Sequence, residues 1–266
     1  MLLKGKRPVS PVDRELALVE KQEKKLSAAA EKRAGAKWKD SLEAKVPGRI
    51  YTALDGAFCK GFALVFDKGS AIIEKSYAVD KITADYSIRD YAFQVKGGRR
   101  ELRQIHKGAR QSGLLNMAMT TAEGIGLGAL GIGLPDIVLF LGTLLRGIYE
   151  TALSYGFDYK SDFEKLLILK MLSASLSSGE DYEKQNRQVD ELLAAPEREV
   201  GNTEMEKQIK ETSSAFAMDM LLLKFLQGLP VVGIIGGAAN PVYYRRVMSY
   251  VQLKYKKRYL LRLKSR

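Results

Sequence analysis

Two stretches of the sequence carry almost no charge and are rich in glycine, and they restrict the fold more than any other feature. Residues 111–145 contain only two charged side chains, Glu123 and Asp136, and residues 225–244 contain none. Each stretch includes the triplet Gly-Leu-Pro, and the two triplets lie 95 residues apart in the sequence. Further identities at this offset indicate an internal repeat. We therefore expect two similar units, each a helix, a break and a second helix, packed against one another.

The glycines in these stretches are spaced for close helix packing. Gly124 and Gly128 lie four residues apart, as do Gly233 and Gly237, so each pair would share one helix face and let another backbone approach. A glycine inside a helix costs roughly 0.5–1 kcal/mol relative to alanine, so this many glycines require compensation. We expect close helix crossings at these positions: Gly124, Gly128, Gly133, Pro135, Gly142, Gly233 and Gly237.

The first stretch is also long enough to cross a bilayer, because about 20 apolar residues suffice. Asp136 argues against one straight span, since a carboxylate near its centre would cost roughly 2.5–3.5 kcal/mol. Directly after Pro135 it would instead lie in the first turn of a new helix, where the helix dipole favours an anion. We therefore expect a helical body whose glycine-rich centre lies close to, or partly in, a membrane surface. There are two alternatives for the glycine-rich stretches. They could form close helix crossings buried in a soluble core, or helical hairpins fully inserted in a membrane.

The rest of the sequence predicts helices only. One core helix is expected where apolar residues recur every four positions. Its row consists of Ile50, Leu54, Phe58, Phe62 and Phe66. A second helix is expected from about 86 to 110, with a break at Gly97, and others begin at capping boxes that open with Ser161 and Thr203. No stretch alternates apolar and polar residues as a strand would.

We therefore expect an all-α protein with a single helical domain over residues 38–266. Residues 1–37 contain a helix that begins after Ser10 and is charged nearly all round. Such a helix projects from the body or lies on its surface, so we expect a charged N-terminal arm.

Cysteine and histidine content excludes much thiol and metal chemistry. The chain has 266 residues, with Cys59 and His106 as its only cysteine and histidine. One cysteine cannot form an intrachain disulfide, and the two residues cannot build a zinc cluster. We expect no metal and no cofactor, and we expect His106 at the surface of a basic helix. The N-terminus lacks the apolar core of a secretory signal, which predicts a cytoplasmic protein.

The net charge of +12 is concentrated near the ends of the chain. Residues 245–266 hold nine basic residues and no acid. Val247, Val251, Tyr255 and Tyr259 would follow one helix face, which is typical of a basic amphipathic helix at a membrane interface. We expect this helix to dock on anionic lipid, at about 1 kcal/mol per basic residue. The residues expected to bind lipid are Arg245, Arg246, Lys254, Lys256, Lys257, Arg258 and Arg262.

Two other functions are weaker alternatives. Aromatic and basic residues mix in 243–266 as in some nucleic-acid-binding proteins, but helical spacing explains them better, so nucleic acid is an unlikely partner. A hydrolase acting on a lipid or peptide substrate would use the carboxylates of Asp136, Glu150 and Asp158, although Arg146 and Glu150 are spaced for an ordinary ion pair. The glycine-rich stretch lacks the Gly-Lys-Ser/Thr ending of a nucleotide-binding loop, and no serine nucleophile elbow is present.

Motifs around the first Gly-Leu-Pro triplet form a distinctive series. They read Gly-Leu-Pro-Asp at 133–136, Leu-Arg-x-Ile-Tyr at 145–149 and Tyr-Gly-Phe-Asp at 155–158. An acidic turn and a leucine-rich helix follow.

The second half continues the series with Pro-Val-Val-Gly at 230–233, then Asn240, then a basic and aromatic helix that closes at Arg258. Over residues 38–262 the sequence resembles the EcsC family of bacterial proteins. The charged helix before Trp38 looks like an addition to the family core.

The resemblance implies a context rather than a reaction. The family is named for the third member of an operon whose other products form an ABC transporter, which implies a cytoplasmic or membrane-associated accessory role. It supplies no catalytic residue. A family site would comprise Asp136, Arg146, Tyr149, Tyr155 and Asn240. We therefore expect a non-enzymatic accessory protein, peripherally bound to an anionic membrane surface, with an ABC transporter or another membrane protein as a further partner.

Overall fold

The structure, a computed structural model, describes residues 9–34, 48–66, 70–110, 134–226 and 239–266. All regular structure in these ranges is helical, as the sequence predicted. The helices are α1 (Pro11–Ala34), α3 (Gly48–Leu64), α4 (Ser70–Glu74), α5 (Val79–Lys96), α7 (Leu134–Ser154), α8 (Asp162–Leu176), α9 (Gly179–Ala194), α10 (Asn202–Leu226) and α11 (Ala239–Ser265), together with a helix over 99–110.

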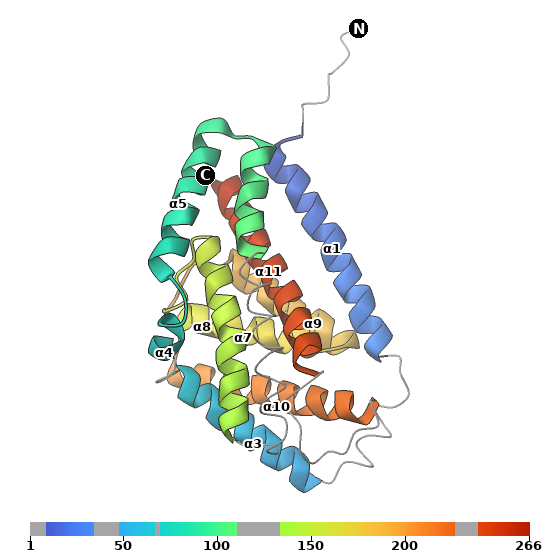
Figure 1. Cartoon of the computed structure of the whole chain (residues 1–266). Helices are drawn as coiled ribbons and strands as arrows, with labels where there is room; N and C mark the ends of the chain where they lie inside the picture. The colour runs from blue at the N-terminus through green and yellow to red at the C-terminus, as the bar shows by residue number, and fades with distance from the viewer. Residues whose placement is uncertain (1–8, 35–47, 67–69, 111–133, 227–238) are drawn as a thin grey trace.

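The C-terminal helix α11 lies at the centre of the arrangement (Figure 1). It packs against α1, α7, α8 and α9, while α3 and α10 pack together at one end of the molecule. Residues 243–260 of α11 supply much of the core, and Tyr244, Tyr255 and Tyr259 are almost fully buried. The sequence predicted a helix here, but the structure makes it a core helix rather than an interfacial one.

Local signals explain several helix ends. The Asp13 backbone N–H donates to Ser10 Oγ at 3.0 Å, and the Glu164 N–H donates to Ser161 Oγ at 3.2 Å, so the caps predicted at Ser10 and Ser161 are confirmed. The cap predicted at Thr203 is wrong, because α10 already begins at Asn202. Gly97 ends α5 with a φ of 61°, a left-handed conformation that glycine adopts without strain. The predicted break between α5 and helix 99–110 is therefore confirmed.

The predicted apolar row of α3 faces the core. Phe58 and Phe62 are fully buried, and their ring centroids lie 5.2 Å and 5.6 Å from that of Phe216 on α10. A Cβ on Gly61 would lie 2.9 Å from Ile137 Cγ2, so this glycine allows α3 and α7 to cross closely.

Gly142 makes no close crossing with the part of the chain that the structure describes, because a Cβ there would meet none of its atoms within 4 Å. The close approach of α7 to α11 occurs at Gly147, where a Cβ would collide with the Tyr244 hydroxyl. The other expected glycines, at 124, 128, 133, 233 and 237, lie outside the described residues. Helix α7 begins at Leu134, so Pro135 lies in its first turn, as the expected break requires.

The charged helix α1 lies along the surface of α9 and α11 rather than projecting from them (Figure 1). Val19 and Ala30 bury their side chains on its inner face. The sequence is compatible with both arrangements, and the packed one is observed. Residues 35–47, where the arm was expected to join the domain, are outside the described part of the chain.

Within the described residues, one helical segment is apolar and long enough to cross a membrane, Ile137–Ser154 with a mean hydropathy of 1.4. It is 67% buried by other parts of the protein. The core helix of a globular domain has the same properties, so this segment is weak evidence for a membrane span.

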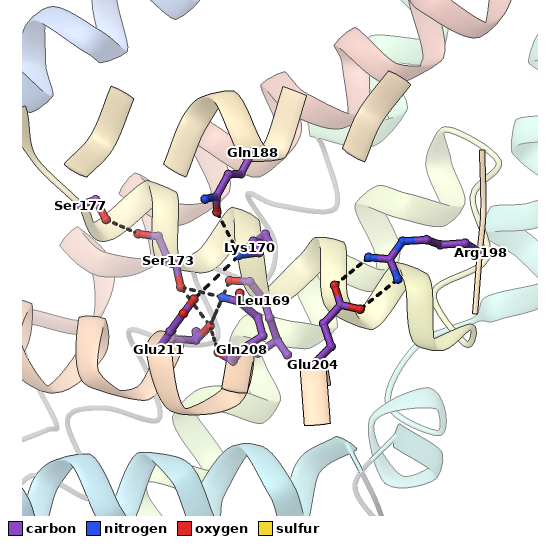
Figure 2. A network of polar contacts seen from close by, with 10 residues as sticks. Leu169, Lys170, Ser173, Ser177, Gln188, Arg198, Glu204, Gln208 and Glu211 are labelled. Carbon is purple, nitrogen blue, oxygen red and sulfur yellow. Dashed lines mark hydrogen bonds and ion pairs between the residues drawn. The ribbon is translucent and has the colours of Figure 1, made fainter. Parts of the chain in front are cut away.

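Polar contacts join α8 to α9 and α10 (Figure 2). Lys170 Nζ donates to Gln188 Oε1 of α9 at 3.0 Å and lies 3.8 Å from Glu211 of α10. The buried Thr212 hydroxyl lies 3.0 Å from Ser173 Oγ. Buried polar groups that have partners position helices without the penalty of an unmade hydrogen bond, so these contacts fix how α8 and α10 pack.

Candidate functional site

The cations of α11 that were expected to face lipid mostly have carboxylate partners. Lys254 is fully buried, and its Nζ lies 2.5 Å from Glu23 Oε1 and 2.7 Å from Asp190 Oδ1. Lys257 Nζ lies 3.0 Å from each of the same two carboxylates. These contacts attach α11 to α1 and α9, so the charge is used inside the protein.

Two arginines of α11 are also held by carboxylates. Arg258 Nη1 lies 2.6 Å from Glu164 Oε2, and the guanidinium sits 4.2 Å from the centroid of Phe157. Glu164 is fully buried and also accepts from the Tyr255 hydroxyl at 2.6 Å. Arg246 donates to both oxygens of Asp219, at 2.9 Å and 3.0 Å.

Arg262 instead donates to backbone carbonyls, those of Tyr155 at 2.8 Å and Gly156 at 3.2 Å. Of the expected lipid-binding residues, Arg245 is exposed and Lys256 lines a groove. The predicted interfacial helix is thus corrected to a core helix, because acids from distant parts of the sequence neutralise it.

That groove, of about 850 Å³, lies between α1, helix 99–110 and α11. Helix 99–110 presents a stripe of basic residues to it, since Arg99, Arg103, Lys107 and Arg110 recur at helical spacing. Lys25 of α1 and Lys256 of α11 add two further cations. Leucines from α1 and α11 form an apolar wall, so the groove is both cationic and apolar.

A buried carboxylate lies at the floor of the groove. Glu15 is 3% exposed, and its Oε2 accepts from Lys256 Nζ at 2.8 Å while its Oε1 accepts from Arg99 Nε at 3.3 Å. Burial tends to raise the pKa of this carboxyl, but the Lys256 and Arg99 bonds outweigh it and hold the pKa below its usual value. Glu15 is therefore ionised and fixes Lys256 and Arg99 in place.

His106 lies beside Glu15 and is buried, which corrects the expectation that it is a surface residue. Burial and the nearby Lys256 charge lower its pKa to about 3, so the imidazole is neutral near pH 7. Its Nδ1 lies 3.2 Å from the Tyr155 hydroxyl, and its Nε2 has no hydrogen-bond partner and lies 3.9 Å from Glu15 Oε2. If the buried Tyr155 hydroxyl donates to Nδ1, the imidazole proton is on Nε2.

Four cations around this groove are exposed and have no carboxylate partner among the residues the structure describes. We call them the cationic rim: Lys25, Arg103, Lys107 and Arg110. Like charges four residues apart on a helix destabilise it, and among the described residues only Arg99 of the stripe has a carboxylate partner, Glu15. The rim therefore gathers four exposed cations around one groove.

The carboxylates considered for hydrolysis do not form a catalytic pair in the described structure. Glu150 is buried, and its Oε1 accepts from Arg146 Nε at 3.0 Å, the ordinary pair that the spacing indicated. Asp158 is exposed and accepts from the Lys160 backbone N–H at 3.0 Å. The side chain of Asp136 lies outside the described residues, although its backbone is in the first turn of α7.

The residues of the expected family site separate into two places. Tyr149 stacks on Tyr159 with centroids 4.1 Å apart, and Arg146 lies 6.0 Å from the ring centroid of Tyr77, whose hydroxyl donates to Tyr159. Tyr155 lies at the groove instead, against His106. The Asn240 side chain is not described. In the described part of the chain, no three His, Cys, Asp or Glu side chains are grouped to hold a metal ion.

Sequence reasoning missed the groove, although part of its signal was present. The spacing of Arg99, Arg103 and Lys107 already places three cations on one helix face. The sequence gives no such signal for Glu15, because it comes from a helix 84 residues away from Arg99.

Comparison with known proteins gives one match. A family model described as the EcsC protein family matches residues 12–260. No curated protein and no solved structure matches the chain. The match includes nearly all of α1, which the sequence resemblance had placed outside the family core, and the structure packs α1 onto α11. The chain belongs to the EcsC protein family.

Proposed function

We propose that this protein is a non-enzymatic, membrane-associated accessory protein that docks on an anionic lipid surface through its cationic rim. The observation that supports the proposal is the contrast in pairing: most cations of α11 have carboxylate partners, whereas the rim cations have none in the described structure. Free cations on one face contribute about 1 kcal/mol each near an anionic membrane. Four of them suffice for reversible, salt-sensitive binding.

The position of the rim in the sequence also favours a membrane. Helix 99–110 leads directly into the glycine-rich stretch that starts at residue 111, which carries only two charged side chains up to residue 145. Basic residues next to an apolar stretch are typical of segments that meet the headgroup region of a bilayer. The proposal therefore keeps the lipid surface expected from the sequence but moves the contact from α11 to helix 99–110 and α1.

Flotation with vesicles tests this proposal. The full chain is mixed with neutral phosphatidylcholine vesicles or with vesicles containing phosphatidylglycerol, at low and high salt. We expect flotation only with the anionic vesicles and a marked decrease at high salt. Truncation of residues 254–266 is unsuitable as a test, because Tyr255 and Tyr259 belong to the core.

Matched double variants identify the face that docks. Arg103→Gln with Lys107→Gln removes two rim charges, and Lys184→Gln with Arg187→Gln removes two exposed charges from α9, outside the groove. Only the first variant should lose flotation. Equal loss in both variants would indicate a net-charge effect, and equal flotation with neutral and anionic vesicles would contradict the proposal.

A further inference from the structure

We propose that the groove behind the cationic rim binds one phosphate-type oxyanion that carries an apolar part. This inference deepens the proposed function and relies on it for a membrane as the source of the ligand. The geometry of the groove supports it independently, through its size, its arrangement of charge and its apolar wall.

The groove is large enough for an organic ligand rather than an ion alone. Its volume of about 850 Å³ lies in the range of small-molecule sites, roughly 300–1,000 Å³. It is formed by three helices that are distant in sequence, and the Glu15 bonds to Arg99 and Lys256 connect them. The walls of the site are therefore held in place before a ligand arrives.

The charge of the groove favours an oxyanion. Arg103 and Arg110 present planar guanidinium groups suited to two parallel hydrogen bonds with a phosphate, and Lys107 lies between them in the sequence. Glu15 occupies Arg99 and Lys256, so the resident carboxylate leaves the rim cations unmatched. An anion at the rim would also relieve the repulsion along the helix stripe.

His106 adds a neutral donor at the floor of the groove. Its Nε2 is buried and has no hydrogen-bond partner in the described structure, which is uncommon for a polar atom in a folded protein. With the Tyr155 hydroxyl donating to Nδ1, the Nε2–H can donate to a ligand oxygen without adding charge. The arrangement thus combines cations at the rim with an uncharged donor below.

The apolar wall indicates that the ligand is more than a free phosphate. Leu18 on α1 is 40% exposed, and Leu26 and Leu253 line the same cavity. Burying apolar ligand groups against these side chains would be favourable. A phospholipid headgroup with the first part of its acyl chains has this combination of oxyanion and apolar group.

Calorimetric titration of the full chain with soluble probes tests the inference. The probes are dihexanoyl phosphatidic acid below its micelle concentration, inorganic phosphate, and dihexanoyl phosphatidylcholine. We expect the phosphatidic acid to bind at least about tenfold more tightly than either other probe, because it alone offers a free phosphate monoester and chains together. Equal binding of inorganic phosphate would overturn the apolar part of the inference, and no binding of either anion would overturn the site.

Single substitutions test the cationic rim and the apolar wall of the groove separately. Arg103→Gln should weaken phosphatidic acid about tenfold or more. Leu18→Gln should weaken phosphatidic acid while leaving the weaker binding of inorganic phosphate unchanged. Arg187→Gln on α9 is the matched control and should change neither. Thermal unfolding of each variant establishes that it is folded, and unchanged binding in both groove variants would place the ligand elsewhere.

Flotation and titration together distinguish this inference from the proposed function. A protein that floats with anionic vesicles but binds none of the soluble anions docks by its surface alone, and the groove site is then wrong. A protein that binds phosphatidic acid in solution but does not float has the groove site, and membrane docking is then wrong.

Discussion

Two parts of the protein are rich in cations: the interface of α11 with α1, α8 and α9, and the groove beside helix 99–110. They differ in whether these cations have carboxylate partners. At the interface, Lys254 is fully buried between Glu23 and Asp190, and Arg258 is bound to the buried Glu164. Along the groove, Arg103 and Lys107 are exposed and have no such partner in the described structure. The first region uses positive charge to position helices, and the second leaves it available for a ligand.

This difference shows why a charge count along the sequence is a poor guide to a binding surface. The densest basic segment of the chain is α11, but the structure brings acids to it from α1, α8, α9 and α10. The shorter stripe on helix 99–110 receives one buried carboxylate, Glu15, which contacts Arg99. Pairing in three dimensions, rather than composition, decides which cations are free.

The largest expected effect tests the paired region. Glu164→Gln removes the charge that compensates the buried Arg258, so we expect a loss of about 3 kcal/mol in the free energy of unfolding. Glu204→Gln is the control, because its pair with Arg198 is about half exposed on both sides and should be worth no more than about 1 kcal/mol (Figure 2). Urea unfolding monitored by circular dichroism measures both. Similar losses in the two variants would show that burial does not distinguish these pairs.

A second variant tests whether ion pairs hold α1 in place. Glu23→Gln weakens the contacts of Lys254 and Lys257 with α1, at a cost of about 2 kcal/mol. Hydrogen exchange of α1 amides should therefore accelerate by roughly thirtyfold, while α8 amides change less. Glu20→Gln changes an exposed acid on the same helix and should leave exchange unaltered. Unchanged protection of α1 in the Glu23 variant would mean that its apolar contacts alone hold it.

A pH titration examines the floor of the groove, where His106 faces Glu15, Lys256 and Tyr155. The folded protein holds the pKa of His106 at about 3, whereas the unfolded chain protonates near 6.5. As the pH falls below 6.5, the unfolded state gains a proton that the folded state does not, so stability decreases until the pH reaches the folded pKa. Between pH 7.5 and 5.0 we expect a loss of about 2 kcal/mol.

Urea unfolding at both pH values measures this loss. The His106→Phe variant should show a smaller decrease between the two values, whatever its absolute stability. An equal decrease in the variant would assign the pH dependence to other groups.

The sequence predicted the helices well because their signals are local. The four-residue row from Leu54 to Phe62, the Ser161 cap and the break at Gly97 each depend on neighbours along the chain, and all three are confirmed. These features are set by side-chain spacing and backbone conformation within one or two turns.

The sequence predicted the environment of side chains less well, because burial and pairing depend on distant residues. His106 was expected at the surface, yet it contacts Tyr155 from the turn after α7. Gly142 was expected at a crossing that Gly147 makes instead, since the rotation of α7 against α11 decides which glycine faces Tyr244. The groove likewise arises only when α1, helix 99–110 and α11 come together.

The smallest expected effect is on the stability of a rim variant, and it directly tests whether the rim cations differ from the paired cations of α11. Arg103→Gln with Lys107→Gln removes two cations that have no carboxylate partner among the described residues, so the free energy of unfolding should change by no more than about 0.5 kcal/mol. The sign should be stabilising, because the variant removes repulsion along the stripe, and the gain should shrink at high salt. Urea unfolding at two salt concentrations measures it. A decrease of more than about 1 kcal/mol in the free energy of unfolding would mean that these cations have partners within the protein. The rim cations would then stabilise the fold, as those of α11 do, and would not be available for a ligand.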